Sequence, residues 1–438
     1  MTNWILLLKD IKDLFFSKTA LLILIIISFL TGYSFYSAVT LYNNASVNAV
    51  SDTVYAKGFE PVPGVFTPTF GGIFLIFSLF LPFVFIPMVS NERKNNTLTI
   101  LLQIPYSFLK VLSSKAISGI LFLLFIIFFS SIPSLIMWQI WDGHIPIAEI
   151  VLLFSGYFLY GIVVLAISLF SSTIFMDSAG ASIFSIALII SSWFIDFGKD
   201  MNISPILVYI SDWTLTRQMK FFENGILSLP TILYFLILSA MFFLLSYFFL
   251  RRDLKRKSLT AFITILSGII LIFAASKALV YHDITESMRN SFSPQINRAL
   301  REIPSMEIDV YMERTDSRFR DYDKSFLQKL YLVNPHVKVN LIKGESLKER
   351  YGIFVYNING KSEQTYSNSE EEIFPIIFNI AGIKPDESSE ANEYQGYPLL
   401  TTENQQTSVL YIYFAVINVI LIFLYVLKGI IIRRRNLI

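Results

Sequence analysis

Few residues in this sequence have the types and spacing that catalysis or metal binding requires. Its histidines, His144, His282 and His336, are not spaced as a metal pair, and no cysteine is present for a zinc site or a disulfide. Gly360-Lys361-Ser362 matches the end of a phosphate-binding loop, but Val355 stands where that loop needs its first glycine. We therefore expect no catalytic residue, no metal site and no nucleotide site in this chain.

The most informative polar residues lie in the segment NERKNNTLTILLQIPYS, which spans residues 91–107. The acid Glu92 and the bases Arg93 and Lys94 separate two long stretches that are almost free of charge. Asn95, Asn96 or Thr97 can cap a short helix with an apolar stripe, which a proline ends: Leu98, Leu101, Leu102 and Pro105. Such a stripe beside charges suits contact with a partner protein; the alternative is an ordinary interfacial loop.

Composition places the chain in a membrane. Hydrophobic residues make up 54% of it, charged residues only 16%, and the mean hydropathy is +0.58. A membrane-crossing helix needs roughly 20 apolar residues. Eight stretches qualify: 19–42, 67–89, 116–138, 150–173, 179–195, 229–250, 259–279 and 409–428. None of them contains Asp, Glu, Arg or His, and lysine occurs only at the ends of the last two, as Lys277 and Lys428, which disfavours an ion-coupled carrier. Pro82, Pro87 and Pro133 should loosen the second and third spans.

The orientation follows from the basic residues, because cytoplasmic loops carry the excess of Lys and Arg. Basic clusters precede span one and follow spans two, six and eight, so alternating spans place all of them on one side. We therefore expect both termini and the segment 91–107 in the cytoplasm of a bacterial cell and residues 281–408 outside it. Residues 3–17 should form an interfacial helix, with Trp4, Leu8 and Leu14 on its apolar face and Lys9 and Asp10 on its polar face.

The charged segment resembles a motif of ABC-2 type transporter permeases. The matching residues are Glu92-Arg93, Thr97-Leu98, Leu101-Leu102, Pro105, Ser107 and Lys115, with Asn96 in place of the family's usual glycine. In that family the segment is a coupling helix, here residues 92–106, which docks on a separate ATPase subunit. The resemblance implies ATPase-coupling roles for Glu92, Arg93, Thr97, Leu98, Leu101, Leu102, Pro105 and Ser107. ATP and Mg would bind to the partner, and this chain would bind no cofactor.

Residues 1–257 have the layout of the same family, with an interfacial helix, six spans and a basic exit. The segment between spans five and six is too polar to cross the membrane. Its aromatic residues Trp213, Phe221 and Phe222 favour the outer membrane surface. In ABC-2 permeases short external helices that dip into the outer leaflet occupy this place. The resemblance implies an external re-entrant segment of this kind, with Gly225 as its turn residue.

The region after span seven is soluble in character. We expect helices over 294–302, 322–333 and 370–383, strands over 306–312, 337–342 and 351–357, and a hairpin turn at Asn359-Gly360. This order predicts an α/β layer domain of thioredoxin-like type. Residues 384–408, rich in Glu, Ser, Asn and Gln, read as a tether.

The external region also resembles the auxiliary subunit of gliding-motility-associated ABC transporters, over about 100 residues. Asp283, Thr285, Ser291, Ser293-Pro294 and the Arg-rich stretch before Leu330 carry this resemblance. The family's subunit begins with a span, exposes its domain and returns through a last span, and the domain in this chain is shorter. Arg314, Arg318 and Arg320 could contact an anion; local salt bridges are the simpler reading.

These observations predict an α-helical polytopic membrane protein with an inserted extracytoplasmic α/β domain. Its parts are a cytoplasmic interfacial helix, a permease domain, a seventh span, the external domain, a tether, an eighth span and a basic tail: 1–18, 19–257, 258–280, 281–383, 384–408, 409–428 and 429–438. We expect a non-enzymatic permease subunit of an exporter, located in the bacterial cytoplasmic membrane.

The expected partners are a cytoplasmic ABC ATPase dimer, a second permease copy or sister permease, membrane lipid, and a substrate or envelope partner at the external domain. Nucleic acid is not expected as a partner. The alternative function is a signalling or scaffold protein, in which the ATPase moves the external domain to act on an envelope partner without transport.

Overall fold

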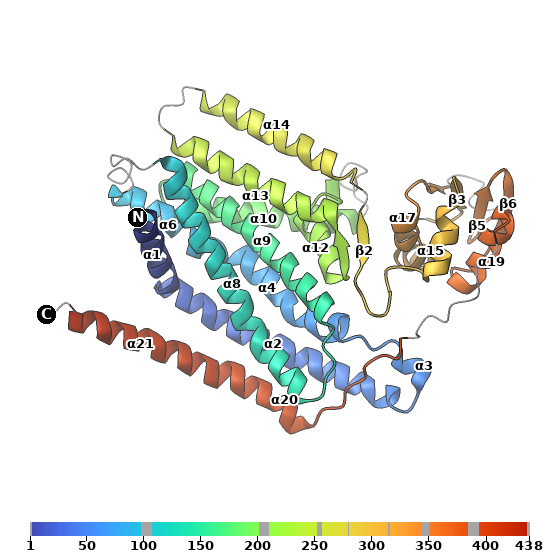
Figure 1. Cartoon of the computed structure of the whole chain (residues 1–438), viewed down its shortest axis with the longest axis horizontal. Helices are drawn as coiled ribbons and strands as arrows, with labels where there is room; N and C mark the ends of the chain where they lie inside the picture. Colours follow the sequence, from blue (N-terminus) through green and yellow to red (C-terminus); the bar gives the residue numbers. More distant parts are fainter. Residues whose placement is uncertain are drawn as a thin grey trace. The chain divides into compact units, whose positions relative to one another are not determined.

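The computed structural model describes residues 2–97, 107–200, 210–251, 256–278, 280–313, 316–342, 350–383 and 394–435. In these ranges eight helices are long and apolar enough to cross a membrane, so the chain is an α-helical, multi-pass membrane protein. Its contacts divide it into two compact units. The first comprises Met1–Val280 and Gln395–Ile438, and the second comprises Tyr281–Tyr394 (Figure 1).

The membrane unit begins with α1 (Thr2–Phe15), which packs against α8, and with α2 (Lys18–Ala49), the first candidate span. Ser17 begins α2 because its hydroxyl accepts the backbone N–H of Ala20. At 1.5 Å per residue α2 is roughly 48 Å long, longer than the hydrocarbon core of a bilayer. We call the end of the bundle that carries α1 the α1 end, and the other the far end.

The stretch predicted as the second span, residues 67–89, is divided at two prolines. After α3 (Thr53–Ala56), η1 (Val62–Phe66) and α4 (Thr67–Leu79) form one candidate span, and α5 (Leu81–Phe85) and α6 (Pro87–Lys94) follow it. Pro82 and Pro87 each lie in the first turn of a new helix, where the missing N–H costs nothing. The second span thus covers Val62–Leu79 rather than 67–89, and Pro82 and Pro87 lie beyond it. Pro133, by contrast, lies inside the uninterrupted α8, so the expected loosening does not break that helix.

The centre of the bundle is α9, the candidate span with the largest buried share, 67%. It contacts α4, α8, α10, α12 and α13. Close packing around it uses glycine: a Cβ on Gly156 would lie 2.5 Å from Phe222, and one on Gly161 would lie 2.8 Å from Leu123. The bounds of this part of the unit are α8 (Phe108–Ile140), α9 (Ile147–Ile174), α10 (Ser178–Asp200), α12 (Leu215–Glu223), β1 (Ile226–Ser228) and α13 (Leu229–Leu250).

Two further spans pack on different helices of this bundle (Figure 1). The seventh, α14 (Lys257–Ala275), packs on α13. The eighth consists of α20 (Glu403–Leu410), η3 (Tyr411–Val416) and α21 (Ile417–Arg435), which pack on α2. Lys428 of α21 donates to the carbonyl of Phe16 and lies 4.4 Å from the centre of its ring. Both chain ends therefore lie at the α1 end, as eight alternating spans require.

The second unit is an α/β domain with a four-stranded sheet in the order β4-β3-β5-β6. The pair β3/β4 is parallel, and the pairs β3/β5 and β5/β6 are antiparallel. The helices between β3 and β4 supply the crossover that a parallel pair needs. The bounds are β2 (Tyr281–Asp283), α15 (Pro294–Arg301), β3 (Met306–Val310), α16 (Ser317–Tyr322), η2 (Asp323–Leu327), α17 (Gln328–Val333), β4 (Lys338–Leu341), β5 (Phe354–Ile358), β6 (Lys361–Thr365) and α19 (Glu370–Ala381).

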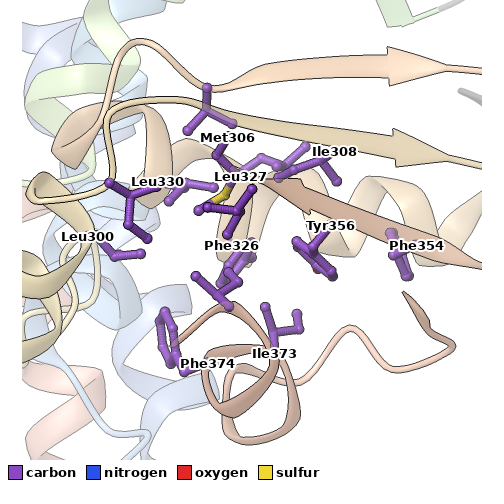
Figure 2. Packing of buried hydrophobic residues seen from close by; sticks show 14 of the residues in the cluster. Leu300, Met306, Ile308, Phe326, Leu327, Leu330, Phe354, Tyr356, Ile373 and Phe374 are labelled. Atoms are coloured by element: carbon purple, nitrogen blue, oxygen red, sulfur yellow. The ribbon is translucent and has the colours of Figure 1, made fainter. Parts of the chain in front are cut away.

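One face of this sheet carries the core of the domain. Ile308 of β3 and Tyr356 of β5 are paired across the sheet and fully buried, and Figure 2 shows them beside Phe326, Leu330 and Ile373 from the helices. The other face is polar: Asp309 accepts from the side-chain amides of Asn340 and Asn357 at 2.8 and 2.9 Å. In β3 the buried residues Met306, Ile308 and Val310 thus alternate with Glu307 and Asp309.

The helices and strands expected in this domain are found within a few residues of their predicted limits. The hairpin at Asn359-Gly360 is also confirmed, because both residues have positive φ, 51° and 77°, and β5 pairs with β6 across them. The eighth membrane helix starts at Glu403, inside the predicted tether. Thr402 begins it with a capping box to Gln405.

We predict that Gly32→Ala separates α2 from the eighth span. Its Cβ would lie 2.4 Å from the Cβ of Tyr413, an atom that cannot move without the backbone. The same contact includes the hydrogen bond from the Ser28 hydroxyl to the carbonyl of Tyr413, 2.6 Å long. Thermal unfolding of the purified protein should show a loss of about 1–3 kcal/mol.

The matched control is Gly71→Ala, also in a membrane helix, where no atom lies within 4 Å of the new Cβ. This change should leave stability unchanged or raise it by up to about 1 kcal/mol. Equal effects of the two variants would show that the close approach of α2 and Tyr413 does not limit stability.

Candidate functional site

Four charged side chains form a network at the α1 end, in which Lys115 and Asp10 are buried and Lys9 is exposed. Lys115 of α8 is 2% exposed, and its ammonium lies 2.8 Å from Glu92 Oε2 and 3.4 Å from Asp10 Oδ1. Lys9 of α1 approaches the other oxygen of Glu92 at 2.8 Å. The hydroxyl of Ser114 donates to Asp10 Oδ2 at 2.7 Å. The network therefore joins α1, α6 and α8 through two cations and two anions whose formal charges cancel.

Burial and pairing act on its two carboxyl groups with opposite results. Burial raises the pKa of Asp10, and the nearby Lys115 ammonium and the Ser114 hydroxyl oppose this only in part. Burial would also raise the pKa of Glu92, but the ammonium groups of Lys115 and Lys9 outweigh it and lower that pKa. Glu92 is therefore the anion that the network holds most firmly.

The neighbouring Arg93 fixes α6 to the central helix. Its Nη1 donates to the carbonyls of Ser172, Thr173 and Phe175 at 2.7, 2.8 and 3.1 Å. These carbonyls lie at the carboxyl end of α9, where unpaired C=O groups and the helix dipole favour a cation. In addition, the hydroxyls of Ser90 in α6 and Ser178 in α10 lie 2.7 Å apart. Glu92 and Arg93 thus anchor α6 in two directions.

The remaining residues of the predicted coupling segment divide into two groups. Thr97 donates its hydroxyl hydrogen bond to the carbonyl of Glu92 at 3.2 Å, and Asn96 has a positive φ of 57°, a backbone conformation that glycine adopts most easily. Ser107 caps α8 by accepting from the N–H of Lys110. The apolar stripe and its proline, Leu98, Leu101, Leu102 and Pro105, lie outside the described residues.

A cavity of about 490 Å³ opens beside the network. Apolar residues of α5 line one part of it. The polar lining comes from α1, α6 and α8 and includes Lys9, Asp13, Asn91, Glu92 and Lys115. It lies where the segment after α6 leaves the bundle. The α1 end therefore has room for rearrangement next to its most tightly paired charges.

The predicted external segment packs at the far end. Phe222 of α12 is buried against Gly156 of α9, and its ring lies 6.0 Å from that of Phe235. The carbonyl of Trp213 accepts from the hydroxyl of Tyr234 at 2.7 Å. Phe221 is half-buried, and Gly225 follows α12 with a left-handed φ of 79°. The segment thus rests on α9 and α13.

The arginines considered for anion contact do not converge in the described part of the chain. Arg318 donates to the backbone carbonyls of Gly352 and Tyr366, which ties α16 to the strands. Arg320 is exposed, and Arg314 lies outside the described residues. Among the described residues no group of His, Asp and Glu could hold a metal ion.

The sequence pattern predicts that Asp10 lies on the polar, solvent-facing side of its helix, and this prediction is wrong. Leu6, Asp10 and Leu14, spaced by four, are the buried residues of α1, whereas Trp4 and Leu8 are 69% and 58% exposed. The protein-facing stripe of α1 therefore includes a carboxylate. It is tolerated there because Ser114 donates a hydrogen bond to it and Lys115 forms an ion pair with it. The spacing of Asp10 from Leu6 and Leu14 was the signal available in the sequence.

Comparison of the chain with protein-family models, curated proteins and solved structures gives no match.

We predict that Lys115→Met destabilises the protein by about 3–5 kcal/mol, because it leaves two carboxylates buried without their shared cation. Thermal unfolding of the purified protein would measure the loss. Lys110→Met, an exposed position on the same helix, should change stability by less than about 1 kcal/mol. If Lys115→Met is as mild as this control, the network does not hold the helices together.

The loss caused by Lys115→Met should shrink as the pH falls from 7 toward 4. In the native protein Glu92 has a lowered pKa, so its contribution is present above the ordinary carboxyl pKa and is lost on acidification. In the variant the pKa of each carboxyl would be higher than in the native protein, because the Lys115 ammonium that favours both charged forms is gone, so protonation would relieve part of the loss. Unfolding curves of both proteins across this pH range test the sign; a loss that grows on acidification would contradict it.

Proposed function

We propose that this chain is the transmembrane permease subunit of an ABC-2 type ATP-binding cassette exporter, driven by a separate cytoplasmic ATPase. The α1 end would face the bacterial cytoplasm, and residues 281–383 would form an extracytoplasmic domain. The basic clusters of the sequence support this orientation, since Lys9, Lys12 and Lys18 lie at the α1 end. A second copy or a sister permease would complete the path.

The observation that carries the proposal is the anchoring of α6. Glu92 binds α1 and α8 through Lys9 and Lys115, and Arg93 binds the end of α9. The residues that follow α6 are those with the leucine stripe, so a force on that stripe would be applied to α6 itself. The ion pairs of Glu92 would then transmit the force to α1 and α8, and the hydrogen bonds of Arg93 would transmit it to the central helix. In this proposal Glu92 and Arg93 are positioning residues, and Leu98, Leu101 and Leu102 contact the ATPase.

The external domain is proposed to be thioredoxin-like. Its strand order β4-β3-β5-β6, with a parallel pair, an antiparallel hairpin and a closing helix α19, supports this assignment. The chain has no cysteine, so thiol–disulfide exchange would not be its activity. It would instead bind a substrate or an envelope partner.

A second candidate is a signalling or scaffold protein whose external domain is moved by the ATPase. The segment that leads back from that domain is hydrogen-bonded to the first span. The N–H of Leu399 donates to the Ser46 hydroxyl at 3.1 Å, and that of Thr401 donates to Asn43 Oδ1 at 2.6 Å. A shift of α2 would therefore move this segment. Transport assays with labelled lipids or glycans distinguish the two functions.

We predict that a cytoplasmic ATPase co-purifies with the native chain from membranes in mild detergent and that Leu101→Asp removes or uncouples it. A buried aspartate would place a charge in the apolar contact without an arranged partner. The measurements are the amount of ATPase protein and the ATPase activity that co-purify with each variant, both determined in the same eluate.

Leu400→Asp is the matched control, since Leu400 is 53% exposed and lies at the far end. It should retain the ATPase. A native eluate that keeps its other membrane partners but contains no ATPase would refute the permease proposal, whereas equal retention by both variants would refute the role of the leucine stripe.

A further inference from the structure

A second cavity, of about 740 Å³, opens at the far end of the membrane unit. It lies where α2 ends and the chain turns through α3 toward the second span. Its principal lining side chains are Tyr42, Tyr55, Phe59, Asp52 and Glu60. Three aromatic rings and two carboxylates thus face one space, and its lining set among the described residues contains no lysine or arginine.

Phe59 stands steeply to each of the two tyrosine rings. Tyr42 and Phe59 have ring centres 5.4 Å apart and planes at 76°, and Tyr55 and Phe59 have centres 5.8 Å apart and planes at 63°. Rings inclined in this way can contact one bound ligand from more than one direction. Aromatic faces carry negative electrostatic potential, and boxes of them bind ammonium groups that bear alkyl substituents.

The aromatic wall is fixed before any ligand arrives. The hydroxyl of Tyr42 donates to the carbonyl of Tyr397 at 2.8 Å, and the N–H of Tyr397 donates to the carbonyl of Phe59 at 2.9 Å. Gly64 permits this position of the ring, because a Cβ there would lie 2.6 Å from Tyr42. Tyr42 and Phe59 are buried, and Tyr55 is 54% exposed. Preorganised walls reduce the entropy cost of binding.

The carboxylates add charge without forming an ion cage. Asp52 accepts from the N–H of Tyr55 at 3.2 Å, and both Asp52 and Glu60 have interactions within the protein. A small hard cation such as Ca²⁺ needs six to eight oxygen ligands, which two engaged carboxylates do not provide. A weakly hydrated organic cation needs only negative potential and aromatic surface.

We propose that this cavity binds an alkylammonium group, carried either by a free organic cation or by a phospholipid head group. Tyr42, Phe59 and Tyr55 form its aromatic walls, and Asp52 and Glu60 supply the complementary charge. The proposal is independent of the proposed transport function, because binding is measured on the purified chain without an ATPase.

The test is thermal unfolding of the full chain in detergent with tetramethylammonium chloride or choline. Each should raise the unfolding midpoint in a concentration-dependent manner, relative to sodium chloride at equal ionic strength. The neutral choline analogue 3,3-dimethylbutanol should not. Tyr55→Leu and Glu60→Gln should each weaken binding about 2- to 30-fold.

Tyr33→Leu is the matched control, since Tyr33 is a 62% exposed tyrosine of α2 that does not line the cavity. It should bind as the native chain does. If Tyr55→Leu fails to fold, Glu60→Gln supplies the comparison alone.

Nanodiscs distinguish the two sources. A free cation shifts the midpoint in both phosphatidylglycerol and phosphatidylcholine discs, whereas a lipid head group already occupies the site in phosphatidylcholine, so tetramethylammonium then acts only in phosphatidylglycerol. The proposal is overturned if tetramethylammonium has no effect in either detergent or phosphatidylglycerol discs. Equal shifts with the neutral analogue, or unchanged binding by the cavity variants, would also overturn it.

Discussion

The pairing of Lys115 with Glu92 and Asp10 is the constraint on which the α1 end depends. An ammonium group that is only 2% exposed cannot be left without anions, because its desolvation would cost several kcal/mol. Its two anions come from helices far apart in the sequence, so the charge is satisfied only when α1, α6 and α8 are packed together. One buried cation therefore requires the arrangement of three helices.

Arg93 extends this arrangement into the centre of the bundle. Its bonds to the last carbonyls of α9 connect the end of α6 with the most buried span. At the other end of the bundle, α2 is bonded to the segment 397–401 and packs on the eighth span. The fold thus contains a continuous series of contacts from the charged segment after span two to the residues that precede the last span. Both proposed functions use this connection.

Patterns of neighbouring residues in the sequence predicted the strands, the turn and the membrane spans, because interactions between residues close in sequence determine these elements. The alternation of Met306, Ile308 and Val310 and the Asn359-Gly360 turn fix the sheet of the α/β domain, and apolar length identified the spans. Long-range pairing could not be read in the same way: Asp10 and Lys115 are 105 residues apart, and no periodicity links them. The family motif contains both Lys115 and Glu92, but it does not pair Lys115 with Asp10, which reaches it only because α1 packs on α8.

Photo-crosslinking in living cells tests the central claim, that the segment after α6 contacts an ATPase. A photoreactive phenylalanine analogue would replace Leu98 in one variant and Leu400 in another, and the adducts would be identified by mass spectrometry. The account predicts that the variant at Leu98 crosslinks to a protein with a phosphate-binding loop and that the variant at Leu400 does not. Adducts at Leu98 only with lipid, or with a protein that binds no nucleotide, would contradict the account.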